Sequence, residues 1–261
     1  SYRIFHQRID PETKMALADA DNHKAMRINP RDNQQNLTHD YLQELESLPA
    51  RMRRRFLEGA YAEVAPGALW TEELIDTWRV RDGDIPDMQR IIIGVDPSGA
   101  GDEENEGNDP IGIVVCGLGT DGNGYVLEDL TLKAGPKTWG SATVAAYERH
   151  AADLIVAEKN FGGEMVRFVI QAASSKVPFK FVTASRGKVV RAEPISALHE
   201  KGKLRFVGRF NELEDEMCAF THNGFAGDKS PNRADAFVWA MSELFYGMTR
   251  EEPAKAKPRA M

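Results

Sequence analysis

Residues 91–99 read Ile-Ile-Ile-Gly-Val-Asp-Pro-Ser-Gly and constrain the fold of this chain more than any other stretch. Three isoleucines followed closely by Val95 predict a β-strand that is covered on both faces, as in the sheets of α/β proteins. Asp96 would then lie at the carboxyl end of the strand, where open α/β sheets place their binding and catalytic groups. An Asp before Pro97 and Gly99 is also ordinary turn chemistry, so Asp96 alone does not define a site.

A second carboxylate occurs in a comparable setting. Residues 153–158, Asp-Leu-Ile-Val-Ala-Glu, predict another buried strand, which ends at Glu158. Between the two come predicted strands at 111–118 and 125–130, joined by a hairpin turn, and a helix at 138–151. This order makes the first and fourth strands candidate parallel neighbours, so that Asp96 and Glu158 would leave the sheet at the same end and face each other.

The third carboxylate lies in the last predicted helix, residues 230–245. Ser230 is expected to cap this helix, with Pro231 in its first turn. Asp235 lies on the border of the apolar stripe, so it should point toward the sheet, although an Asp near a helix start is also favoured by the helix dipole alone.

Three carboxylates directed at one place repel one another unless divalent cations neutralise them. Such an oxygen-ligand site suits Mg²⁺ or Mn²⁺. A pair of ions about 3.5–4 Å apart can activate water and stabilise the leaving oxygen in phosphodiester cleavage. The predicted catalytic and metal-binding residues are therefore Asp96, Glu158 and Asp235. Asp109 is a fourth candidate ligand, with a plain loop Asp as the alternative.

The charges of the central region are unevenly distributed. Residues 96–109 contain six acidic residues and no basic ones, whereas residues 180–209 contain eight basic and two acidic residues. A basic surface beside an acidic site is expected where a DNA backbone is bound next to metal ions. The predicted DNA-binding residues are Lys180, Arg186, Lys188 and Arg191, with solvated surface charges as the alternative. No base-reading motif is evident, so largely sequence-independent cutting is expected.

The composition is typical of a soluble protein with one large domain, alone or with an extension. The chain has 261 residues, of which 42% are hydrophobic and 28% charged, and a net charge of -7. Cys116 and Cys218 lack metal-site or disulfide spacing and are expected to be reduced core residues. No apolar run approaches the ~18–20 residues that span a bilayer, and no signal peptide is evident, so a cytoplasmic protein without membrane contact is expected.

Five short motifs follow one another along the second part of the chain. They are Gly94-Val95-Asp96-Pro97, then Ile155-Val156-Ala157-Glu158 with Asn160 and Gly162-Gly163, then Gly187-Lys188 with Arg191-Ala192-Glu193-Pro194, then Leu213-Glu214-Asp215, and last Ser230-Pro231-Asn232-Arg233-Ala234-Asp235-Ala236. In this order they resemble the nuclease domain of the large terminase subunit of tailed bacteriophages. The resemblance covers about residues 90–247.

This resemblance implies an α/β fold of the RNase H-like (RuvC/integrase) type, a mixed five-stranded sheet flanked by helices, here with a helical N-terminal extension. It also implies an endonuclease that cuts concatemeric viral DNA during genome packaging with two Mg²⁺ or Mn²⁺ ions. The metal-binding acids of the family fall on Asp96, Glu158 and Asp235. One departure is Asn232, where the family often has another Asp, so no extra acidic ligand is expected there.

The resemblance divides the chain into three parts. Residues 1–88 are expected to be a helical linker or extension, because residues 1–85 resemble the linker that follows the ATPase motor in the same proteins. Residues 89–248 form the expected nuclease domain, and residues 249–261 a flexible charged tail. The chain begins with Ser and contains no Gly-x-x-x-x-Gly-Lys-Ser/Thr phosphate loop, so it is expected to be part of a longer protein and to lack an ATP site.

The family further implies double-stranded DNA, the portal protein and the small terminase subunit as partners, in the cytoplasm of an infected host cell.

Three alternatives remain open from the sequence. A resolvase or transposase-like nuclease of the same fold would share the three acids but would select DNA junctions. Residues 94–99 also resemble the first phosphate loop of actin-like ATPases and sugar kinases, although the second, glycine-rich loop of those enzymes is not found. The third alternative is a non-catalytic DNA-docking module whose acids are only structural.

Overall fold

The computed structural model describes residues 16–17, 20–23, 29–47, 53, 56–58, 67–97, 109–159, 163–183, 187–227 and 230–249. Predictions that fall on other residues, among them Arg186 and the tail beyond residue 249, lie outside the described residues. The chain divides into two compact units, Ser1–Glu63 and Val64–Met261. The elements with described bounds in the first unit are the 3-10 helices η2 (Ala20–Asn22) and η3 (Pro30–Asn36) and the α-helix α1 (His39–Ser47).

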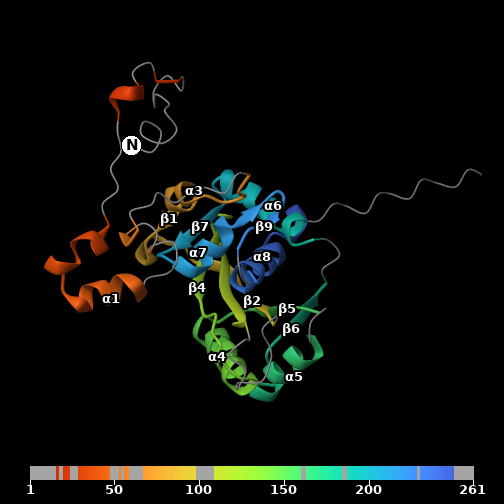
Figure 1. Ribbon diagram of the computed structural model, residues 1–261. Helices are drawn as coiled ribbons and strands as arrows, with labels where there is room; N and C mark the ends of the chain where they lie inside the picture. The colour runs from red at the N-terminus through yellow and green to blue at the C-terminus, as the bar shows by residue number, and fades with distance from the viewer. Residues whose placement is uncertain are drawn as a thin grey trace, which may run out of the picture. The chain divides into compact units, whose positions relative to one another are not determined.

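The second unit is built on a sheet of seven strands (Figure 1). In spatial order these are β1 (Arg79–Val80), β7 (Leu204–Val207), β4 (Gly124–Asp129), β3 (Gly112–Gly119), β2 (Met88–Asp96), β5 (Leu154–Glu158) and β6 (Phe179–Val182). Strand β3 is antiparallel to both neighbours, and all other neighbouring pairs are parallel. The predicted parallel pairing of the first and fourth strands is confirmed by β2 and β5.

The mixed α/β architecture is therefore as predicted, but the sheet has seven strands instead of five. One additional strand is β7, which joins the sheet beside β4. Strand β1 then pairs with the outer edge of β7. A strand of two residues has no measurable hydrophobic period, so its sequence carries no signal of it.

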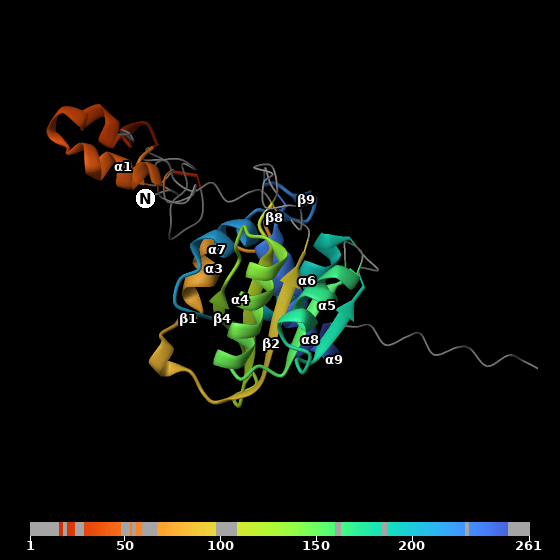
Figure 2. The ribbon, with the colours of Figure 1, turned by 90° about the horizontal axis from the view of Figure 1, so that it is seen from below.

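Helices cover both faces of the sheet (Figures 1 and 2). Helices α4 (Pro136–Arg149) and α5 (Gly163–Ala173) pack on one face. The other face is covered by α6 (Lys188–Glu200), α7 (Asn211–Cys218) and α8 (Asn232–Leu244). The remaining elements are α3 (Glu72–Thr77), the 3-10 helix η4 (Asp82–Asp84), the hairpin β8 (Phe220–Thr221) and β9 (Gly224–Phe225), and α9 (Tyr246–Thr249). Within the described part of the chain, every helix is too short or too polar to span a bilayer.

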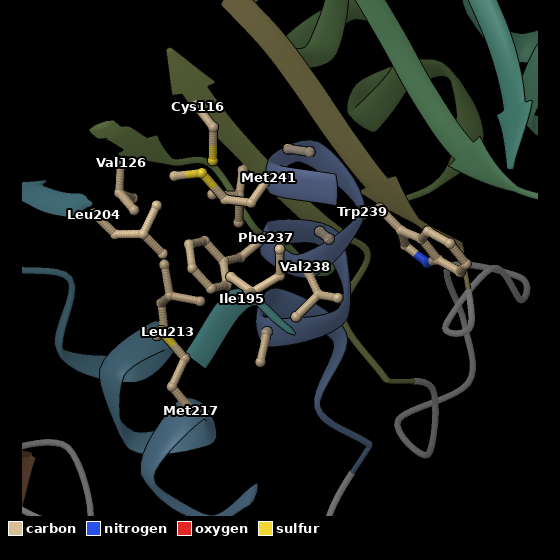
Figure 3. Close-up of a cluster of buried hydrophobic side chains, with 14 of the residues drawn as sticks. Cys116, Val126, Ile195, Leu204, Leu213, Met217, Phe237, Val238, Trp239 and Met241 are labelled. Atoms are coloured by element: carbon tan, nitrogen blue, oxygen red, sulfur yellow. The ribbon is translucent and has the colours of Figure 1, made fainter. Parts of the chain in front are cut away.

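The side chains of β2 alternate between the two cores, because successive strand residues point to opposite faces. Ile93 and Val95 pack in the core under α4 and α5, whereas Ile92 packs in the core under α8, and all three are fully buried. In the second core, Phe237 and Met241 of α8 point toward Cys116 and the neighbouring strands (Figure 3). Asp96 lies four residues after Ile92 and therefore points to the same face of the strand. Its side chain thus lies on the face of the sheet that α8 covers.

Helix α8 lies unusually close to the sheet because two glycines face it. A Cβ atom at Gly94 would lie 2.0 Å from the carbonyl oxygen of Ala236, and one at Gly112 would lie 1.9 Å from that of Asn232. Both contacts are with the backbone of α8, so no side-chain rotation could relieve them. The helix therefore rests directly on β2 and β3, which fixes the height of its first turn above the ends of these strands.

The compact unit also includes residues that precede the predicted domain start at residue 89. Trp70 and Ile75 are fully buried in the core under α8. The guanidinium of Arg79 donates two hydrogen bonds to the carboxylate of Glu214 in α7, with N···O distances of 2.7 and 2.9 Å. Residues 69–80 thus fold together with the sheet, and the boundary between the two units, after Glu63, lies earlier than the predicted boundary after residue 88.

Candidate metal and nucleic-acid site

Asp96 and Glu158 end two neighbouring strands at the same edge of the sheet. Val95 of β2 is paired in parallel with Ala157 of β5, so the next residue of each strand lies at the same level. Residues paired in register point to the same face, and both acids lie on the face covered by α8. The predicted meeting of these two carboxylates at one edge is therefore consistent with the strand register.

Asp235 reaches the same edge from above the sheet. Asp96 is paired across the sheet with Gly112, and the backbone of Gly112 lies against Asn232, the first residue of α8. Asp235 follows one turn later, and its amide N–H donates to the carbonyl oxygen of Pro231 at 2.8 Å. Both Asp96 and Asp235 are only 3% exposed.

Two basic residues of α6 lie among these acids. The Lys188 ammonium forms a short ion pair with Oδ2 of Asp235. Nη2 of Arg191 lies 3.6 Å from Oδ1 of Asp235 and 3.9 Å from Oε2 of Glu158. One guanidinium group therefore contacts two of the three predicted acids, which shows that Glu158 and Asp235 share one site.

The Arg191 side chain is held from a second direction by Trp239. The guanidinium carbon lies 4.5 Å from the centre of the indole ring, within the range of a cation–π contact. Trp239 lies one turn beyond Asp235 on α8 and points away from the Phe237 side of that helix (Figure 3). The Arg191 side chain is only 12% exposed and is held between the carboxylates and the indole ring.

The donors at this edge are carboxylate oxygens, which suit Mg²⁺ or Mn²⁺. Among the described residues, however, no group of three or more His, Cys, Asp or Glu side chains is arranged so that it could hold a metal ion as it stands. Lys188 and Arg191 supply the positive charge at the carboxylates instead. The chemistry of the donor set fits a divalent ion, although Lys188 and Arg191 already contact the Asp235 carboxylate.

The other predicted site residues that the structure describes are Asp109 and Lys180. Asp109 precedes Pro110, whose carbonyl oxygen accepts a hydrogen bond of 2.7 Å from the Asn232 side chain, so it lies near the start of α8. Lys180 instead contacts Glu243 near the end of α8, with Nζ···O distances of 2.8 and 3.0 Å. Glu243 lies eight residues after Asp235, which corresponds to about 12 Å along a helix. The Lys180 ammonium therefore lies away from Asp235, although Lys180 is only two residues from Val182, the strand partner of Glu158.

The basic stretch at residues 180–209 does not form one surface. Helix α6 has 13 residues, so it carries the chain about 20 Å, from the carboxyl edge of the sheet to the amino edge. Lys203 lies at that amino edge, where its carbonyl oxygen accepts from the Gly124 amide at the start of β4. Arg205 stacks on Trp78, 4.4 Å from the ring centre. Only part of the predicted DNA-binding charge is thus next to the acids.

The start of α8 is held by residues that the sequence analysis missed. Ser230 does not cap the helix, because the cap residue is Pro231, which makes no side-chain cap hydrogen bond. A carboxylate from α7 replaces it, since Oε2 of Glu216 accepts from the Ala234 amide at 3.0 Å. Arg233 is surrounded by three acids, Asp129, Glu212 and Glu216. The sequence carries no local signal of this contact, because Ser230 is an ordinary cap residue and Glu216 lies on another helix.

Glu216 makes the stability of the domain dependent on pH. Burial raises the pKa of its carboxyl group to about 7, from an ordinary value of 4.5, although the Ala234 amide and Arg233 favour the charged form. Between pH 4.5 and 7 the folded state therefore binds more protons than the unfolded state, so the free energy of unfolding falls as pH rises through this window. We expect Glu216→Gln to flatten that fall by on the order of 2–3 kcal/mol in urea unfolding at a series of pH values.

Glu212→Gln is the matched control for this measurement. Glu212 lies on the same helix and pairs with the same Arg233, but its side chain is 61% exposed. Its substitution should leave the pH profile of unfolding close to that of the wild type. A Glu216→Gln profile as steep as the wild-type profile would contradict the assignment of the raised pKa to Glu216.

Most of the sheet lies within a segment that matches a known protein family. The family model of the terminase RNaseH-like domain matches residues 93–245, which include every strand from β3 to β9, the last four residues of β2 and the whole of α8. The fold is therefore of the RNase H-like class. Within that class, the chain belongs to the terminase RNaseH-like domain family. The sequence matches none of the curated proteins compared with it.

Solved structures of large terminases share this fold. The nuclease domain of the P22 large terminase superposes with a TM-score of 0.53 at 14% identity, over 72% of this chain and 96% of that one. The large terminase nuclease of the thermophilic phage G20c gives a TM-score of 0.46 at 16% identity, over 63% and 86%. The large terminase of a second thermophilic bacteriophage gives a TM-score of 0.50 at 12% identity, over 87% of this chain and 58% of that one.

Proposed function

We propose that this chain is a Mg²⁺- or Mn²⁺-dependent endodeoxyribonuclease that cuts concatemeric viral DNA during genome packaging, with little sequence specificity. The proposal is supported by two observations: Asp96 and Glu158 end two strands that are paired in register, and Arg191 contacts both Glu158 and Asp235. The family match supports the same function, and a solved structure of similar fold is described as the nuclease domain of the P22 large terminase.

In the proposed reaction, Asp96, Glu158 and Asp235 would hold two divalent ions. When bound, such ions would supply a water of lowered pKa and stabilise the leaving oxygen of the phosphodiester. Asp96 is held by the end of β2, and Asp235 by the first turn of α8, which the Gly94 and Gly112 contacts press onto the sheet. Both acids are nearly inaccessible to solvent, which strengthens their interaction with cations. Asp109, near the start of α8, is a further candidate ligand.

The proposed partners follow from the family. Double-stranded DNA is the substrate, with Lys188 next to the acids as the best placed phosphate contact. The portal protein and the small terminase subunit are proposed as partners in the packaging machine, in the cytoplasm of the infected host cell. Residues 1–63 form a unit of their own and are proposed to connect the nuclease to the remainder of a longer large subunit.

Incubation with supercoiled plasmid tests the proposal. We expect nicked and then linear DNA in the presence of Mn²⁺ or Mg²⁺, and no cleavage after chelation with EDTA. A four-way junction offered together with the plasmid separates this function from that of a resolvase, which would cut the junction selectively. Intact plasmid at every metal concentration would contradict the proposed nuclease.

A second function is favoured by one specific observation, the pairing of Asp235 and Glu158 with Lys188 and Arg191. If these pairs are permanent, the acids are structural and the chain is a DNA-docking module of the packaging motor. DNA binding without metal-dependent cleavage, equal in the wild type and in Asp96→Ala, is the result expected of such a module.

A further inference from the structure

Helix α6 introduces two positive charges into the proposed metal site. Lys188 is the first residue of this helix and Arg191 lies one turn later, so both point to the same side. Lys188 pairs with Oδ2 of Asp235, and Arg191 with Oδ1 of Asp235 and Oε2 of Glu158. Both oxygens of the Asp235 carboxylate are thus already in contact with a cation.

The two cations are held to different degrees. The Arg191 guanidinium is 12% exposed, contacts two carboxylates and stacks on Trp239, so it is fixed from three directions. The Lys188 side chain is 42% exposed and reaches Asp235 from the rim of the site. A lysine ammonium is a strongly hydrated point charge on a flexible stem, whereas a stacked guanidinium is held in one orientation. Lys188 is therefore the cation that can leave.

We propose that Lys188 competes with the divalent ion for the Asp235 carboxylate, so that α6 sets the metal affinity of the site. This inference rests on the proposed function, because it assigns the same carboxylate to the metal. An ammonium group and a divalent ion at the same carboxylate repel each other and compete for its oxygen lone pairs. Metal binding therefore weakens the Lys188–Asp235 pair, and this pair opposes metal binding.

This competition links metal binding to DNA binding. A Lys188 ammonium released from Asp235 remains at the rim of the site, where the phosphate of a bound DNA strand can replace the lost carboxylate partner. DNA that holds the ammonium away from Asp235 then favours metal binding, and by linkage the metal favours DNA binding by the same factor. Lys188 is the residue that carries this coupling.

Lys180 offers a matched control in the same domain. It also pairs with a buried acid of α8, Glu243, and its side chain has almost the same exposed fraction, 43%. This pair is at the other end of α8 from Asp235. Lys180→Met therefore removes an equivalent lysine–carboxylate pair without changing the charge of the proposed metal site.

The experiment is a Mn²⁺ titration in the absence of DNA, with free Mn²⁺ followed by electron paramagnetic resonance. We expect Lys188→Met to lower the Mn²⁺ dissociation constant by about tenfold, because one competing cation is removed, a difference on the order of 1.4 kcal/mol. Lys180→Met should leave the dissociation constant unchanged. Circular dichroism confirms that each variant is folded.

A second titration, with a non-cleavable phosphorothioate duplex present, tests the coupling. The duplex should tighten Mn²⁺ binding to the wild type severalfold and have a smaller effect on Lys188→Met. A dissociation constant of Lys188→Met that is within twofold of the wild type, or weaker, would overturn the inference. If the wild type still cleaves plasmid in that case, only the competition is wrong. If neither protein binds Mn²⁺ or cleaves plasmid, both the inference and the proposed function fail.

Discussion

Replacement of Asp235 by Asn is expected to reduce metal-dependent DNA cleavage by at least about 100-fold. The substitution preserves the size of the side chain but removes the charge that the proposed metal ions require, and loss of groups that only support a metal ligand already costs about 10- to 100-fold. Asp235 is the acid with the best defined surroundings, since it lies in the first turn of α8 in contact with Lys188 and Arg191. The rate of plasmid nicking in Mn²⁺, at saturating protein, measures the effect.

Glu243→Gln is the control for this prediction. Glu243 lies on the same helix, is similarly buried and is also paired with a lysine and an arginine, Lys180 and Arg90. Both substitutions remove a buried negative charge from α8, so both should affect the free energy of unfolding. Only Asp235→Asn should abolish cleavage. Equal loss of activity in the two variants would attribute the effect to folding, and full activity of Asp235→Asn would contradict the assignment of the site.

The sequence predicts those parts of the fold that have strong local signals. The apolar run of β2 identifies a strand buried on both faces, and the helical crossover before β5 makes these strands parallel neighbours. From that pairing, the common edge of Asp96 and Glu158 follows directly. Once the register of two parallel strands is known, it determines which side chains lie at the same level and on the same face of the sheet.

Other features depend on contacts that no local pattern encodes. A charge count over residues 180–209 does not show that α6 separates the basic residues into two groups at opposite edges of the sheet. The stacking of Arg191 on Trp239 joins residues from two helices, so neither segment alone predicts it. The capping of α8 by Glu216 is a tertiary contact of the same kind. In each case the tertiary partner decides whether a charged side chain binds DNA or belongs to the protein interior.

Substitution of Gly94 by Ala is expected to lower the free energy of unfolding by about 3 kcal/mol or more. The added Cβ would lie 2.0 Å from the Ala236 carbonyl oxygen and 2.9 Å from its carbonyl carbon, so α8 must move away from β2. Overpacking of a core typically costs about 1–3 kcal/mol, and contact with backbone leaves less room for relaxation. Urea unfolding at constant pH measures the change.

The same displacement should impair the proposed site, because α8 carries Asp235 while β2 carries Asp96. Gly112→Ala makes the equivalent contact with Asn232 at the start of α8, so the two substitutions should move one helix and their effects should not add. Gly83→Ala is the control, since a Cβ at Gly83 meets no atom within 4 Å and its backbone angle suits other residues. A Gly94→Ala protein as stable as Gly83→Ala would show that α8 does not rest on β2 at backbone contact. The position of Asp235 above the carboxyl end of β2 would then lose its physical basis.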